Sequence, residues 1–235
     1  MQHIEKHQLI ILAKIFFIVF TFVPTIVDAK VKASLSIRIV DCRDSSRYTY
    51  LNELTLLKKG KVIKKIIPKD QSTENLLNLD TGTYTLKYQT IFMRTEYQTV
   101  VISVYKNYST NICLNFLDYS KESYKPIIDR LKDNESYEVL MSSEGCFGGS
   151  NETWIIKRVQ NVFIISWGLN KKTLSEPEID VIRKFEFELN CKHNYACTTA
   201  DNYRITYNSE IKTIVDGSCH WIGYYYLKNK LLGVR

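Results

Sequence analysis

The chain carries six cysteines, and all of them follow an apolar N-terminal segment. Residues 1–29 combine a weakly basic start, an apolar run from Ile15 to Val27 and a small residue, Ala29, before the predicted cut, which is typical of a secretory signal. A retained membrane anchor is the alternative, but Lys14 and Pro24 break the run short of the roughly 18 apolar residues that a span needs. An even number of cysteines in an exported chain predicts disulfides. We therefore expect a secreted, periplasmic or cell-surface protein with no membrane span after signal cleavage.

Removal of 29 residues from the 235-residue chain leaves 206, which is enough for two domains of ordinary size. The net charge of +7 favours anionic surfaces such as acidic glycans or lipid headgroups. Export makes nucleic acid an unexpected partner. The dense basic cluster surrounds Gly60 between two apolar runs, which favours a solvated hairpin tip guarding a sheet edge over a binding patch. Its members are Lys58, Lys59, Lys61, Lys64 and Lys65.

Residues 30–119 are predicted to form a first domain made of strands. From Ala33 onward apolar and polar residues alternate, with Leu35, Ile37 and Ile39 on one face, which is the period of a half-buried strand. No segment of this region has a helical period, so an all-β sandwich is expected. Further strands are predicted at residues 54–58, 62–67, 84–90, 97–105 and 111–117.

The segment from Leu79 to Tyr88 has the sequence Leu-Asp-Thr-Gly-Thr-Tyr-Thr-Leu-Lys-Tyr, a tight glycine turn that leads into an alternating strand. This pattern resembles the carboxypeptidase regulatory-like and Cna-B-type sandwich domains, with a transthyretin-like fold, of exported bacterial proteins, over about residues 31–118. Such domains serve as stalks, spacers or accessory modules, and the resemblance implies no catalytic residue. The first strand lacks the glycine-rich start that is usual in these families.

In sandwiches of this kind the first and last strands often lie close together, which implies a bond between Cys42 and Cys113. Cys42 ends the first predicted strand and Cys113 lies in the last, and both have the parity opposite to the core side chains. The bond would close a loop of about 70 residues and stabilise the domain by around 4 kcal/mol in the chain-entropy account. Two unlinked thiols are the alternative.

Residues 120–136 are polar and predict a linker, and residues 137–235 predict a second, disulfide-tied domain. A helix is predicted to start at Ser175-Glu176-Pro177-Glu178, with a serine cap and proline in its first turn. A second helix is predicted near the C-terminus, and strands before the first helix and between the two helices would form a small antiparallel sheet. The predicted fold class is mainly β, an N-terminal β-sandwich followed by a smaller α+β domain with two helices.

The stretch from Cys191 to Trp221 holds three cysteines and two histidines. Disulfides are favoured there: Cys197 with Cys219, which flank a strand-turn-strand unit, and Cys191 with Cys146 by elimination. A metal site is the alternative, although the spacing matches no paired Cys-x-x-Cys form, and we expect no cofactor. A nucleophilic thiol with a histidine base is a further alternative. The candidate ligands are Cys191, His193, Cys197, Cys219 and His220.

Trp221, Tyr224 and Tyr225 could stack on a sugar ring, but an aromatic stripe at helical spacing is more often part of a core. No catalytic signature is present, so an enzyme is not the favoured class. The sequence instead favours a non-enzymatic binding or structural protein of the cell envelope, with the sandwich as scaffold and the second domain as interaction face. Its partner would be a protein or glycan of that envelope. The alternative is a secreted hydrolase or thiol enzyme that uses the Cys191–His220 region.

Overall fold

The computed structural model describes residues 32–44, 51–68, 73–104, 106–145, 148–191 and 198–233. The predicted signal, Cys146, His193 and Cys197 lie outside the described residues. The chain divides into two compact units, Met1–Lys32 and Ala33–Arg235, and every helix and strand given below belongs to the second. No helix in the described ranges is long and apolar enough to cross a membrane.

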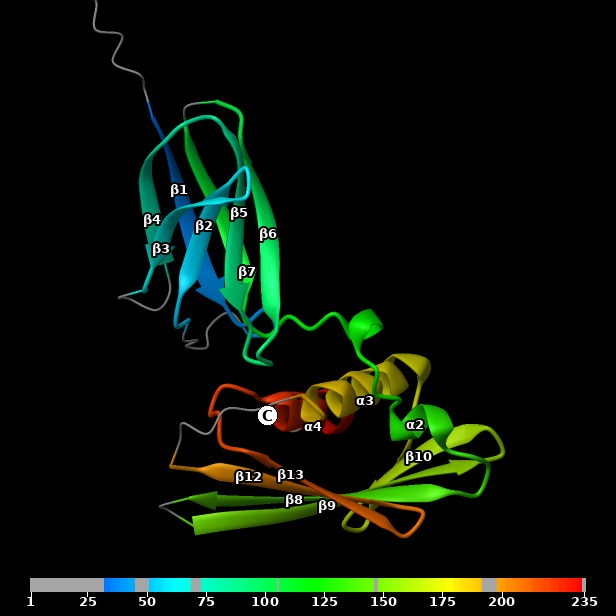
Figure 1. The fold of residues 1–235 in the computed structure, drawn as a ribbon. Helices are drawn as coiled ribbons and strands as arrows, with labels where there is room; N and C mark the ends of the chain where they lie inside the picture. The colour runs from blue at the N-terminus through cyan, green and yellow to red at the C-terminus, as the bar shows by residue number, and fades with distance from the viewer. Residues whose placement is uncertain are drawn as a thin grey trace, which may run out of the picture. The chain divides into compact units, whose positions relative to one another are not determined.

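The first seven strands form two sheets with one core between them (Figure 1). One sheet has the order β4 (Thr73–Leu79), β1 (Ala33–Val40), β7 (Asn107–Cys113). The other has the order β3 (Lys61–Ile66), β2 (Leu54–Lys58), β5 (Gly82–Gln89), β6 (Thr95–Ile102). The predicted β-sandwich is therefore confirmed, although β4 was not among the predicted strands, because its mostly polar sequence lacks a clear alternation.

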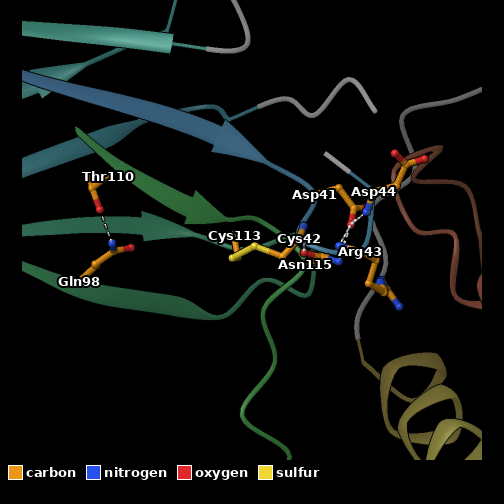
Figure 2. The surroundings of a disulfide bond; sticks show 8 residues. All are labelled: Asp41, Cys42, Arg43, Asp44, Gln98, Thr110, Cys113 and Asn115. Carbon is orange, nitrogen blue, oxygen red and sulfur yellow. Dashed lines mark hydrogen bonds between the residues drawn. A yellow bond between two sulfur atoms is a disulfide. The ribbon is translucent and has the colours of Figure 1, made fainter. Parts of the chain in front are cut away.

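β1 pairs with β7 in parallel, and this neighbourhood carries the predicted disulfide. Val40 and Cys113 are register partners, so Cys42, just past the end of β1, comes within a Cα–Cα distance of 5.4 Å of Cys113. The bond between Cys42 and Cys113 is formed (Figure 2). It closes the ends of the sandwich, as the first and last strands of the resembling families implied.

The second half of the chain forms one six-stranded antiparallel sheet with helices on one face (Figure 1). Its strands lie in the order β11 (Asn170–Thr173), β10 (Val162–Trp167), β9 (Gly148–Val159), β8 (Ser136–Gly145), β12 (Ala200–Tyr207), β13 (Glu210–Asp216). The helical elements are η1 (Tyr119–Lys121), α2 (Ile127–Arg130), α3 (Glu176–Leu189) and α4 (Gly223–Leu232). The mainly β fold with a small helical part agrees with the prediction.

The two longer helices start differently from one another. α3 follows the predicted cap at Ser175 and has proline in its first turn. Cys219, which follows the last strand, has a left-handed φ of 55° and precedes α4 by four residues. The first residue of α4, Gly223, has no room for a side chain, because the Trp221 ring lies against it. A Cβ there would come within 2.1 Å of the ring.

Replacing Glu178 with Ala should lower the free energy of unfolding by about 1 kcal/mol near neutral pH, because it removes the capping carboxylate of α3. That carboxylate accepts from the Ser175 backbone N–H at 2.9 Å and hydroxyl at 2.8 Å, and pairs with Lys172 at 2.5 Å. Hydrogen bonds from Lys172, then from Ser175, lower the pKa of Glu178 from 4.5 to about 2.

A folded-state pKa below the unfolded one means that the contribution is present above pH 4.5 and is lost as pH falls toward 2. Urea unfolding at about pH 7 and about pH 3 should therefore show a wild-type advantage that shrinks at the lower pH. Glu176→Ala, in the same turn, is the control and should change little. An equal loss in both variants would mean that the capping contacts contribute nothing specific.

Candidate functional site

The cysteines of the second domain differ from the predicted pattern. Cys191 carries a free thiol that is 6% exposed and donates to the Phe187 carbonyl at 3.4 Å, so the predicted bond between Cys146 and Cys191 is wrong. The thiol follows the end of α3 and turns back onto the helix, into the core. Cys219 is in a disulfide, but Cys197, its predicted partner, lies outside the described residues.

A thiol at Cys191 is poorly suited to nucleophilic chemistry, because burial raises its pKa to about 11. The described residues contain no group of three or more His, Cys, Asp or Glu side chains that could hold a metal ion. His193 and Cys197 lie outside those residues, so the full set proposed as ligands with Cys219 and His220 stays a prediction.

The aromatic residues considered for sugar stacking do not form one surface. Trp221 and Tyr224 are core residues with exposed fractions of 4% and 1%, whereas Tyr225 is 52% exposed. The Tyr224 ring centroid lies 5.0 Å from that of Trp154 on the sheet, and its hydroxyl donates to Glu152 at 2.8 Å. The stacking platform is therefore not formed, because α4 turns these rings onto the sheet.

Two acidic side chains of α3, Glu186 and Glu188, are buried. Glu186 is fully buried and accepts hydrogen bonds from the hydroxyls of Tyr137 at 2.6 Å and Tyr124 at 3.2 Å. It also accepts from the first two backbone N–H groups of α2, at Ile127 and Ile128. Burial raises the pKa of Glu186, and these four donors oppose that rise. Glu186 thus fixes α2 on α3.

Glu188 faces a different set of partners. It accepts from Arg43 Nη1 at 2.7 Å, from the Tyr119 hydroxyl at 2.8 Å and from Trp221 Nε1 at 2.8 Å. The residue is 3% exposed, and the Arg43 side chain is 15% exposed. The ion pair joins the segment after β1 to α3, and three donors satisfy the carboxylate.

The backbone beside Arg43 is held by a polar clamp below the disulfide (Figure 2). Asn115 donates through Nδ2 to Asp41 Oδ1 at 2.6 Å and accepts the Cys42 N–H at 2.8 Å. Asp41 Oδ1 also accepts the Arg43 N–H at 2.8 Å. With the disulfide, these bonds fix where the arginine side chain begins. From there it extends away from the disulfide (Figure 2).

A cavity of about 220 Å³ lies next to this ion pair. Arg43 is its polar anchor: the guanidinium carbon lies 5.4 Å from the centroid of the Tyr226 ring, and Nε and Nη2 are buried without a hydrogen-bond partner among the described residues. Glu188 already accepts three hydrogen bonds, so the hydrogen-bonding groups without a partner beside the cavity are N–H donors of a cationic side chain. The cavity is lined by Arg43, Tyr119, Val181, Lys184, Phe185, Glu188, Gly223, Tyr226 and Leu227.

Glu186 and Glu188 were not among the predicted site residues. A signal for Glu186 was present, because it lies four residues after Ile182 and three before Leu189, inside the apolar stripe. Nothing in the sequence pointed to Arg43, whose partner is 145 positions away.

Comparison with known proteins assigns no family to this chain. No protein-family model matches the chain, and no curated protein matches it. Among solved structures, the chain is similar to the Bacillus anthracis TIE protein, with 10% identity, 79% of this chain covered and a TM-score of 0.35. The match covers 31% of that chain, and a likeness of this degree carries no functional argument. The resemblance to regulatory-like or Cna-B-type domains is supported only as far as a β-rich fold.

Replacing Arg43 with Met should lower the free energy of unfolding by about 3 kcal/mol, because a buried carboxylate loses its counter-charge. Arg183→Met is a matched control, since Arg183 pairs with Asp129 at 2.8 Å near the surface and should contribute less than about 1 kcal/mol. A double-mutant cycle with Glu188→Gln, followed by urea unfolding, measures the coupling. Equal losses for the two arginine variants, with no coupling to Glu188, would contradict the role given to the buried pair.

Proposed function

We propose that this chain is an exported, non-enzymatic binding protein of the cell envelope, in which the sandwich of residues 30–119 is the scaffold and residues 137–235 carry the recognition face. The signal-like N-terminus and the Cys42–Cys113 bond support an oxidising compartment outside the cytoplasm. The cavity beside Arg43 is the observation that carries the proposal, because it is concave and is lined by apolar and polar side chains. Seven of its nine lining residues belong to residues 137–235, and the scaffold supplies Arg43 and Tyr119.

The group that suits this cavity is an acid on an envelope protein or glycan. Nε and Nη2 of Arg43 are buried without a partner among the described residues, and a carboxylate toward which the guanidinium turned could accept from both together, the fork geometry in which arginine binds acids best. The volume equals that of about seven liquid waters and is smaller than the roughly 300–1,000 Å³ of sites for drug-sized ligands. One acidic side chain or one sugar acid is therefore the expected occupant, with its apolar part against Phe185 and Leu227.

Terminally blocked glutamate and glucuronate should raise the melting temperature of the chain from Lys30 to Arg235, whereas blocked glutamine and glucose should not. A ligand that binds only the folded state stabilises it by mass action, so a weak site is detectable at high ligand concentration. The two acids separate a protein source from a glycan source.

Val181→Phe, which places a ring in the cavity, should abolish the shift, and Val162→Phe, at a 43% exposed strand position, should leave it unchanged. Equal shifts for acid and neutral probes, or a shift that survives Val181→Phe, would remove the cavity as the recognition site.

A further inference from the structure

The edge strand β3 has an unusual surface. Its first five residues, Lys61 to Lys65, are all exposed, so the strand presents both of its faces to solvent. Val62 is 57% exposed and Ile63 53% exposed, and Ile67, just after the strand, is 71% exposed. β3 pairs with β2 alone, at the edge of its sheet (Figure 1).

Lysines surround these aliphatic side chains. Lys59, in the turn, and Lys61 and Lys64, on the strand, have no acidic partner among the described residues. Lys65 pairs with Glu53 at 3.2 Å, but its side chain remains 64% exposed. Lys58 differs from these four, because its amine donates to the Thr81 carbonyl and the Tyr84 hydroxyl, at 3.0 Å each. Four lysines and three aliphatic side chains therefore share this edge, which we call the β3 edge.

Protection of an open sheet edge explains lysines but not the aliphatic side chains. Lysine on an edge strand discourages pairing with another chain, whereas exposed valine and isoleucine promote it. Pairing with a second copy of the β3 edge would bring two lysine rows together and is disfavoured by like charge. The occupant that suits both groups has negative charge at its surface and an apolar layer below it.

We propose that the β3 edge docks on an anionic lipid surface, with the lysines at the headgroup phosphates and Val62, Ile63 and Ile67 in the apolar boundary beneath them. Interfacial binding of this kind combines buried apolar area with attraction to anionic headgroups. An acidic glycan would satisfy the lysines but leave the aliphatic side chains in water. The inference is independent of the cavity, because no cavity residue lies on β3.

Flotation with lipid vesicles tests the proposal on the chain from Lys30, which retains the whole compact unit Ala33–Arg235 and lacks the apolar leader. The protein should float with vesicles of phosphatidylcholine and phosphatidylglycerol in equal parts, and not with phosphatidylcholine alone. Lys61→Gln/Lys64→Gln/Lys65→Gln should weaken binding about a hundredfold, since each lysine near an anionic surface is worth about fivefold.

Two matched variants give the test its specificity. Lys125→Gln/Lys157→Gln/Lys171→Gln removes the same charge from exposed positions outside the sandwich and should leave most of the binding. Val62→Ser/Ile63→Ser should weaken binding, whereas Tyr97→Ser/Val101→Ser on β6, the opposite edge of the same sheet, should not. Tyr97 and Val101 are 62% and 58% exposed, so the two pairs are alike in exposure.

The proposal is overturned if both lysine triples weaken binding equally, because general charge attraction would then suffice. It is also overturned if the serine pair on β3 has no effect, or if soluble heparin binds as tightly as the vesicles, which would indicate an acidic glycan. Because every substituted side chain is exposed, thermal unfolding should be nearly unchanged in all variants, and this measurement excludes a folding defect as the cause.

Discussion

Carboxyl groups are costly to bury unless hydrogen-bond partners surround them, and α3 buries two, those of Glu186 and Glu188, on different sides of the helix. This requirement explains how the second domain is assembled. Glu186 takes its donors from α2, from Tyr124 before it and from Tyr137 on β8, so the segment that leads into the sheet is fixed by one side chain. Glu188 takes donors from Tyr119, from Trp221 just before α4 and from Arg43 after β1. Parts of the chain that are distant in sequence thus converge on a single turn of one helix.

The cavity follows from the second of these carboxylates. Arg43 can reach Glu188 because the parallel pairing of β1 with β7 places Cys42 near Cys113, and because Asn115 and Asp41 hold the backbone after the disulfide. Only Nη1 of Arg43 contacts the acid, which leaves Nε and Nη2 without a hydrogen-bond partner among the described residues. A buried donor without a partner lowers stability, so a group that supplies an acceptor there gains the hydrogen bonds and removes this penalty. The proposed binding would therefore be coupled to stability at one side chain.

Local sequence patterns predicted the features that depend on neighbouring residues, namely most strands and the start of a helix. Alternation predicted most strands of the sandwich, and the serine, proline and glutamate before Ile179 predicted the start of α3. The resemblance to sandwiches whose first and last strands lie close together implied the Cys42–Cys113 bond, which is formed. Elimination failed for Cys191, because counting cysteines does not show which thiol a helix end turns into the core. Trp221 and Tyr224 were correctly suspected of being core residues, since their spacing is helical. The contact of Arg43 with Glu188 could not be predicted, because it depends on how two sheets and a helix are arranged in three dimensions.

The net charge of +7 includes basic residues in different environments, some exposed and some buried, and they are expected to interact with anions in different ways. Exposed lysines on the β3 edge attract any polyanion at long range, and salt weakens that attraction over a Debye length of about 8 Å at physiological ionic strength. Arg43 is largely buried against Tyr226, where salt ions screen its charge less. Its planar guanidinium binds an acceptor best in one defined geometry, through two parallel N–H bonds. Association through the β3 edge is therefore expected to depend steeply on salt and to be tighter for an anionic lipid surface than for a soluble polyanion, because only the lipid covers the aliphatic side chains. Recognition in the cavity should depend less on salt, because geometry rather than accumulated charge selects the ligand.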